Sequence, residues 1–201
     1  MLQIKSKYKI AKRLGNQIFE QTQTQKFALS EARQKKPRGR GTKSDYGRQL
    51  IEKQKVRFTY GLPEKQLSNY AEAAFEEKNP PEALHRALES RLDSAAYRAG
   101  FAGTRRGARQ MVSHGHLLVN GTRITTPSYR LKKGDTITVR EGSRQSPLFG
   151  HMGTEDASNR TIPNWLSVDL GTMTAKVDGE PAYVAAEIPL DYPAVFEFYS
   201  R

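Results

Sequence analysis

Apolar residues recur at helical spacing through the centre of the chain. The first predicted helix covers residues 46–60, where basic side chains share the remaining face. Gly61-Leu62-Pro63 ends this helix, and a second helix follows over residues 64–78. Asn79-Pro80 starts a third, because Asn can cap a helix and Pro fits its first turn. Helical spacing then continues as far as Gly100, so we expect one uninterrupted third helix.

The next stretch predicts a short helix followed by strands. Residues 105–113 have helical spacing, and Thr104 can cap them. Asn120-Gly121 lies between two apolar runs, which is a strong hairpin signal, so two paired strands are predicted within residues 117–124. Residues 137–139 alternate as a further strand. We therefore expect two short helices packed on a small twisted sheet.

The final third of the chain has a less regular pattern. A stretch rich in Gly, Ser and Pro runs from residue 141 to about Pro163 and predicts a linker. Residues 165–169 and 174–177 resemble strands. The apolar run over residues 194–199 predicts a terminal strand that packs on an earlier part of the chain.

Basic residues are concentrated in two blocks. The 201 residues include 33 Lys and Arg against 21 Asp and Glu, a formal charge of +12. Residues 1–60 hold 16 basic and 4 acidic side chains, and residues 91–140 hold 10 and 2, whereas residues 61–90 and 141–201 are net acidic. A polyanionic partner is the leading expectation, and nucleic acid is favoured over an acidic membrane. This uneven distribution of charge along the chain predicts two regions that face RNA.

Several classes of site are disfavoured by composition. The chain has no cysteine, so it lacks disulfides, a thiol nucleophile and cysteine-liganded zinc. Its histidines, His85, His114, His116 and His151, do not have a recognised metal spacing. No apolar stretch approaches the roughly 18 residues that cross a bilayer, and no secretory signal core begins the chain. We expect a soluble, intracellular protein without metal or cofactor.

The N-terminal block predicts a basic arm. It has little hydrophobic periodicity and contains the turn-rich run 35–41, so we expect residues 1–43 to be largely disordered until they order on RNA phosphates. A solvated tail is the alternative interpretation. The candidate phosphate contacts of the arm are Lys7, Lys9, Lys12, Arg13, Lys35, Lys36, Arg38, Arg40 and Lys43.

Arginines at helical spacing carry the strongest prediction of a site. Arg105 and Arg109 are four residues apart, and Arg91 and Arg98 are seven apart, so each pair shares one helix face. Their guanidinium groups are expected to hold phosphates at an RNA helix junction, with recognition by shape rather than by sequence. For any one of them, the alternative is a solvated surface arginine.

Other candidates have two possible roles each. Thr104 is a helix cap or an RNA contact, and His114 and His116 either form an ordinary turn or allow close approach to RNA. Tyr46 can stack on a base or be half-buried. The remaining candidate RNA-binding residues are Arg48, Lys53, Lys55, Arg57, Gln110, Asn120, Arg130, Lys132 and Lys133.

A string of positions in order resembles the α-L RNA-binding motif. The matching residues are Arg91-Leu92-Asp93, Tyr97-Arg98-Ala99-Gly100-Phe101-Ala102, Thr104-Arg105, Ala108-Arg109-Gln110, Val112, His114-Gly115-His116, Val119-Asn120-Gly121 and Pro127-Ser128-Tyr129. This motif also occurs in pseudouridine synthases, tyrosyl-tRNA synthetases and a heat-shock protein. It therefore indicates RNA binding more firmly than any one role.

The flanking sequences are similar to the ribosomal protein S-four family of the small subunit. The segments that carry this resemblance are Ser44-Asp45-Tyr46-Gly47, Leu50, Glu52-Lys53-Gln54-Lys55-Val56-Arg57, Tyr60-Gly61, Pro163-Asn164-Trp165-Leu166 and Phe198-Tyr199-Ser200-Arg201. The resemblance covers almost the whole chain and is weakest in residues 1–40 and 141–162. Some members of the family bind zinc through N-terminal cysteines, which this chain lacks.

The family resemblance implies an α+β protein in which the α-L domain is inserted into a helical domain. The expected parts are a basic arm over 1–43, a helical domain of 44–90 plus about 163–201, the α-L domain over 91–140 and a linker over 141–162. It further implies binding to the five-prime domain of small-subunit ribosomal RNA early in assembly. It also implies contact with ribosomal protein S-five, a place beside the messenger RNA entry region and an influence on decoding accuracy. The resemblance therefore implies that the protein is located on a cytoplasmic ribosome, and an organellar ribosome is the alternative.

Two other functions stay open at this point. One is a stand-alone RNA-binding protein or chaperone that uses the α-L motif, although it would not need the basic arm. The other is an RNA-modifying enzyme, which we do not expect because the chain lacks a Gly-rich phosphate loop and a nucleophile elbow. Too few residues follow position 140 for a separate catalytic domain.

Overall fold

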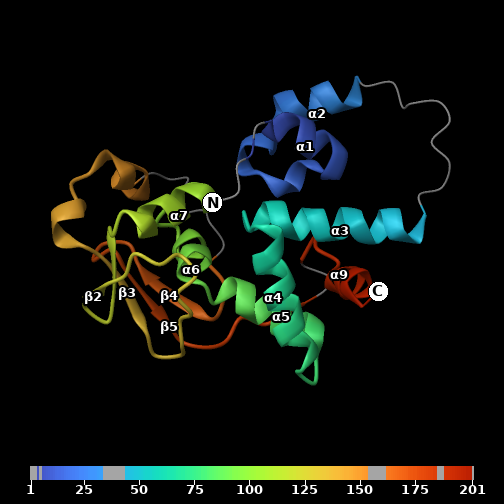
Figure 1. The fold of residues 1–201 in the computed structure, drawn as a ribbon. Coiled ribbons are helices and arrows are strands. Elements are labelled where there is room, and N and C mark those ends of the chain that lie inside the picture. Colours follow the sequence, from blue (N-terminus) through green and yellow to red (C-terminus); the bar gives the residue numbers. More distant parts are fainter. Residues whose placement is uncertain (1–3, 5, 34–43, 154–161, 185–187, 201) are drawn as a thin grey trace. The chain divides into compact units, whose positions relative to one another are not determined.

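The chain folds into two compact units (Figure 1). The computed structural model describes residues 4, 6–33, 44–153, 162–184 and 188–200. The first unit combines residues 1–84 with 183–201, and the second consists of residues 85–182. The chain order is thus an insertion of the second unit into the first, as the resemblance implies. The described residues form helices and one antiparallel sheet, which confirms the α+β class.

Three helices form the centre of the first unit. They are α3 (Asp45–Thr59), α4 (Glu64–Phe75) and α9 (Tyr192–Tyr199), and α5 (Pro80–Glu89) follows α4. Val56, Leu67 and Val195 are buried, and the hydroxyls of Tyr60 and Tyr192 lie 3.3 Å apart. The apolar stripes predicted for the first two helices therefore pack on the C-terminal segment.

The C-terminal segment is a helix, so the predicted terminal strand over 194–199 is wrong. The carboxylate of Asp191 accepts a hydrogen bond from the Ala194 amide, and Pro193 lies in the first turn. Both features favour a helix start. The six-residue apolar run is too short to distinguish a strand period from a buried helix, and packing on α3 selects the helix.

The N-terminal segment has a core of its own. It contains α1 (Lys7–Leu14), the short 3₁₀ turns η1 (Asn16–Ile18) and η2 (Glu20–Thr22), and α2 (Gln25–Ala32). Its buried residues pack against Ile51 and Phe58 of α3. The expectation of disorder is therefore wrong for residues 6–33, because α3 supplies the apolar surface that this segment lacks. Residues 34–43 of the predicted arm lie outside the described residues. The buried residues of this cluster are Ala11, Leu14, Ile18, Phe19 and Phe27.

The second unit packs two helices on a five-stranded sheet. Figure 1 shows α6 (Leu92–Arg98) and α7 (Arg105–Ser113) beside a sheet in the order β2-β1-β3-β5-β4. The predicted hairpin is confirmed, with Asn120 and Gly121 both at positive φ between β1 and β2. The predicted inward side of α7 is confirmed as well. The strands are β1 (Leu117–Val119), β2 (Thr122–Arg123), β3 (Thr136–Val139), β4 (Leu166–Asp169) and β5 (Thr174–Val177).

The predicted third helix is interrupted near Arg91. Helix α5 ends at Glu89, and Arg91 is extended with φ −68° and ψ 141°. The amide of Leu131 donates to the Ser90 carbonyl at 2.9 Å, and the amide of Leu92 donates to the Tyr129 carbonyl at 2.8 Å. This pairing with a distant segment interrupts the helix at residues 90 and 91, which apolar periodicity alone did not reveal.

The second unit also extends beyond the predicted 91–140 domain. Strands β4 and β5 match the predicted pieces, but β5 pairs with β3, so residues 163–182 belong to this unit rather than to the helical domain. The predicted linker is also structured in part. It contains η3 (Glu141–Ser143) and η4 (Pro147–Gly153), and Phe149 joins the core of the unit. Residues 154–161 lie outside the described residues.

Candidate RNA-binding surface

Two buried carboxylates bind the arginines that the sequence assigned to phosphate. Glu89 accepts hydrogen bonds from Arg98 at 2.8 and 3.1 Å and from Arg105 at 2.9 Å. Asp93 is bound by Arg91 at 3.0 and 2.8 Å and by Arg109 at 3.5 Å. The arginines thus join the end of α5 to α6 and α7 in one ion-pair network.

Burial within this network changes the role of Arg91. Its side chain is 1% exposed, so it cannot reach RNA in this structure, and the prediction of an RNA contact there is overturned. The side chains of Arg98, Arg105 and Arg109 are 38%, 15% and 17% exposed. A phosphate would have to compete with a buried carboxylate for each of them, and leaving such a carboxylate unpaired is costly.

His85 lies beside this network. Burial lowers the pKa of His85, and the Arg98 and Arg105 charges add to that effect, whereas the Glu89 charge opposes it. The imidazole is therefore held in its neutral form near pH 7.

The outward side of α7 presents a different set of side chains. Ala108, Met111 and Val112 face the core, so positions 106, 110 and 113 point away from it. Arg106, Gln110 and Ser113 are exposed accordingly. Gln110 was predicted from the sequence, but Arg106 was missed. The helical period was sufficient to find Arg106. At 100° per residue this side chain points almost directly away from the apolar stripe, whereas Arg105 and Arg109 lie at its flanks.

Basic and imidazole groups meet in the turn after α7. The Nη2 of Arg123 donates to the His114 carbonyl at 3.0 Å, and His116 Nδ1 lies 3.0 Å from Ser143 Oγ. Burial lowers the pKa of His116, and the charges of His114, Arg140 and Arg123 lower it further. The positive charges of Arg123 and Arg140 therefore act on the same part of the surface, beside the two imidazoles. We call the exposed set the α7 face: Arg106, Gln110, Ser113, His114, Arg123 and Arg140.

Gly115 allows this turn to form. Its φ is +72°, and a Cβ there would lie 2.1 Å from the Nε of Arg123. The guanidinium of Arg123 therefore covers the turn at a distance that only glycine permits. Arg123 is a second residue that the sequence analysis missed, since no local pattern links β2 to the end of α7.

Substitution of Gly115 by alanine should lower the free energy of unfolding of the second unit by about 1–2 kcal/mol, because of the left-handed backbone conformation. RNA affinity should fall as well, because Arg123 must move. Urea unfolding followed by Trp165 fluorescence measures the first effect. Gly142→Ala is the matched control, since nothing lies within 4 Å of a Cβ placed there. Equal stability of the two variants would show that the turn tolerates a Cβ.

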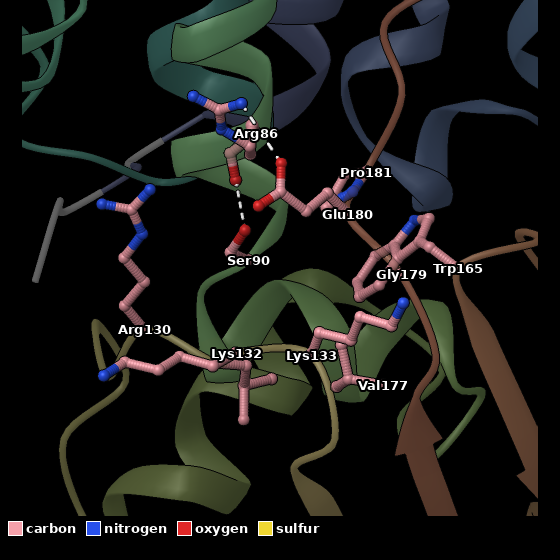
Figure 2. Close-up of a pocket in the computed structure, with 11 residues that line it drawn as sticks. Arg86, Ser90, Arg130, Lys132, Lys133, Trp165, Val177, Gly179, Glu180 and Pro181 are labelled. Carbon is pink, nitrogen blue, oxygen red and sulfur yellow. Dashed lines mark hydrogen bonds and ion pairs between the residues drawn. The ribbon is translucent and has the colours of Figure 1, made fainter.

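Other predicted residues of the second unit have structural partners. The Thr104 hydroxyl accepts a hydrogen bond from the Gly107 amide at 3.0 Å, which confirms the cap. The Asn120 amide group donates to Asp135 and accepts from the Thr136 amide, both at 2.9 Å. Arg130, Lys132 and Lys133 are exposed and line a pocket of about 290 Å³ (Figure 2).

The predicted contacts of helix α3 are bound within the first unit. Lys53 Nζ lies 2.7 Å from Glu64 and 4.2 Å from the centre of the Phe198 ring, and its side chain is 7% exposed. This burial overturns Lys53 as an RNA contact. Lys55 binds Glu52 at 2.7 Å, and Arg57 lies 3.7 Å from Glu64.

The exposed candidates of the first unit lie on α1 and at the start of α3. Lys9, Lys12 and Arg13 are exposed, and Lys7 donates to Gln21 at 2.8 Å. Arg48 is exposed, 4.0 Å from Asp45. Tyr46 is exposed and lies 5.7 Å from the Phe198 ring, centre to centre. Five predicted contacts lie outside the described residues: Lys35, Lys36, Arg38, Arg40 and Lys43.

Comparison with known proteins places both units in one family. The S4 domain profile matches residues 90–137, and that of the ribosomal protein S4/S9 N-terminal domain matches residues 3–92. A small ribosomal subunit protein uS4 of Persephonella marina is 44% identical over 96% of this chain and 95% of its own. The chain belongs to the uS4 family.

Further uS4 proteins agree with this assignment. The protein of Mycobacterium ulcerans is 45% identical over 82% of each chain, and that of Aquifex aeolicus is 45% identical over 79% of this chain and 76% of its own. The matched S4 domain contains α6, α7 and the first strands of the sheet. The structure shows that β4 and β5 complete this domain in the present uS4 chain.

Two other features are missing from the described part of the chain. No group of three or more His, Asp or Glu side chains there could hold a metal ion. Among those same residues, no helix is long and apolar enough to cross a membrane.

Proposed function

We propose that this uS4 chain is a structural component of the small ribosomal subunit and binds small-subunit ribosomal RNA through the α7 face. The main support for this proposal is that α7 and the turn after it expose basic side chains, in a chain that belongs to the uS4 family. Arg106, Arg123 and Arg140 offer guanidinium groups to phosphates. The deep groove of an A-form RNA helix hides the base edges, whereas phosphates and 2′-hydroxyls are accessible to side chains. We therefore expect the protein to recognise the shape of the RNA.

A second set of RNA contacts is proposed on the N-terminal segment. Lys9, Lys12 and Arg13 project from α1, whose apolar side is fixed on α3. The segment then presents its charges from a folded support, so less chain entropy is lost on binding. The basic run over residues 35–43, which follows this segment in the sequence, carries further positive charge. The exposed Arg48 and Tyr46 extend this set.

Finer assignments follow from the family resemblance. We propose that the RNA is the five-prime domain, that binding is early in assembly, and that the chain contacts ribosomal protein S-five and the messenger RNA entry region. The net acidic residues 141–201 are the candidate surface for protein neighbours. An influence on decoding accuracy belongs to the same proposal. The three uS4 relatives named above are bacterial proteins, which supports a cytoplasmic ribosome.

Membership of a ribosomal protein family decides against an enzyme. The stand-alone RNA chaperone is disfavoured for the same reason, since the similarity extends over both units rather than over the S4 domain alone.

Crosslinking and sequencing of bound RNA in cells tests the proposal. We expect the crosslinks to fall on small-subunit ribosomal RNA, with peptides of α7 and the following turn among the crosslinked protein segments. A dominant signal on transfer RNA would contradict the ribosomal role. Crosslinks to ribosomal RNA from other segments alone would move the site away from the α7 face.

A further inference from the structure

A pocket in the second unit is separate from the α7 face. It has a volume of about 290 Å³ and is formed by the end of α5, the turn before β3, and the segment that follows β5. Figure 2 shows Arg86 and Ser90 at the top of the pocket, Trp165 at the right, and Lys132 and Lys133 below Ser90. None of these elements contributes to the α7 face.

The charges around the pocket are unbalanced. Arg86, Arg130, Lys132 and Lys133 line it together with one carboxylate, that of Glu180. Glu180 lies 3.2 Å from Arg86 Nη1. Within the described residues, Arg130, Lys132 and Lys133 form no ion pair. The carboxylate of the nearby Asp135 has other partners. It accepts hydrogen bonds from the Lys132 backbone amide at 2.8 Å and from the Asn120 side chain.

The arrangement of these cations fits a chain of negative charges. Figure 2 shows the Lys132 and Lys133 ammonium groups directed to opposite sides of the pocket, with the Arg130 guanidinium near the side of Lys132. A single small anion would need donors that converge on one point. Cations that diverge along a surface instead match successive phosphates of a nucleic acid backbone.

We propose that this pocket binds the backbone of a second RNA segment, distinct from the one at the α7 face. The inference rests on the proposed function and adds Arg86 and Glu180 to the residues that decide RNA affinity. Successive phosphates lie on Arg130, Lys132 and Lys133, and a further phosphate takes Arg86 from Glu180. The second unit then holds two strands of a junction rather than one.

The role of Glu180 gives this inference a distinctive consequence. Its carboxylate repels a phosphate and competes with it for Arg86. Because the Glu180 side chain is 69% exposed, its loss costs the fold little. Glu180→Gln should therefore tighten RNA binding, a gain that a purely structural role would not produce.

Salt titrations with the full chain and a small-subunit ribosomal RNA fragment test the pocket. Lys132→Gln with Lys133→Gln should weaken binding about 10-fold and reduce the slope of log K against log salt by about 1–2, as expected for lost phosphate contacts. Glu180→Gln should bind about 3-fold more tightly by removing one competing charge. Lys65→Gln with Lys78→Gln is the matched control, since both lysines are exposed and lie in the first unit.

Trp165 supplies a local reporter, because it lines the pocket and is the single tryptophan of the chain. The RNA should change its fluorescence in the wild type and much less in the double lysine variant. An unchanged salt slope, or weaker binding by Glu180→Gln, would overturn the inference. So would a fluorescence response to pyrophosphate that the RNA does not displace, which indicates a small-anion site.

The outcomes separate this inference from the proposed function. If the wild type prefers small-subunit ribosomal RNA over transfer RNA and the lysine variant keeps the wild-type slope, only the pocket fails. If the wild type shows no such preference, the ribosomal function fails, and the variant slopes with either RNA still decide whether the pocket binds a backbone.

Discussion

Replacing Asp93 by asparagine should lower the free energy of unfolding of the second unit by about 3–5 kcal/mol, the usual cost of leaving a buried charge without its partner. The Arg91 side chain is 1% exposed and is bound by Asp93 through both carboxylate oxygens. Asparagine keeps the size and one acceptor but removes the charge. Arg91 then stays buried without the carboxylate that pairs with it.

Urea unfolding followed by Trp165 fluorescence measures this effect, because Trp165 belongs to the core of the second unit. Asp178→Asn is the control, since it removes an exposed carboxylate from the same unit and should change the free energy by less than about 0.5 kcal/mol. Equal unfolding curves for the two variants would show that Asp93 does not balance the Arg91 charge.

Helix α7 of the second unit could be predicted because its signals are local. The stripe of Ala108, Met111 and Val112 defines the inner side of α7, and Thr104 defines its start. Asn120-Gly121 specifies its hairpin for the same reason, since positive φ at both positions is a requirement of the turn itself.

Features that depend on distant residues could not be predicted in the same way. The N-terminal core needs Ile51 and Phe58 of α3, and the break at Arg91 needs the backbone of residues 129–131. The terminal helix shows a different failure. Its start signals, Asp191 and Pro193, are local and were present, but the apolar run that follows suggested a strand.

The arginines of the site show why spacing is not sufficient. A separation of four residues places Arg105 and Arg109 on one face, whether that face meets RNA or an acidic partner. Glu89 and Asp93 are also four apart and lie where these arginines reach them. The acidic partners thus convert a predicted RNA contact into a link between helices, and the exposed residue between the two arginines takes the surface position.

Replacing Arg106 and Arg140 together by glutamine should weaken binding to small-subunit ribosomal RNA about 10- to 100-fold, as expected when two charge-assisted contacts are lost. The slope of log K against log salt should fall in magnitude by about 1.5–2, because two phosphates are no longer neutralised. Both side chains are exposed, so the unfolding curve should stay close to that of the wild type.

Two comparisons make this experiment specific. Lys78→Gln with Lys176→Gln removes the same charge from exposed positions outside the α7 face and should leave the slope nearly unchanged. Arg105→Gln with Arg109→Gln should instead reduce stability, because Glu89 and Asp93 lose one partner each. Suppose that the Arg105 and Arg109 variant lowered the salt slope without losing stability, while the Arg106 and Arg140 variant kept the wild-type slope. The ion-pair network would then be the part that binds RNA. The opposite result assigns RNA binding to the outer side of α7 and structural support to its inner arginines.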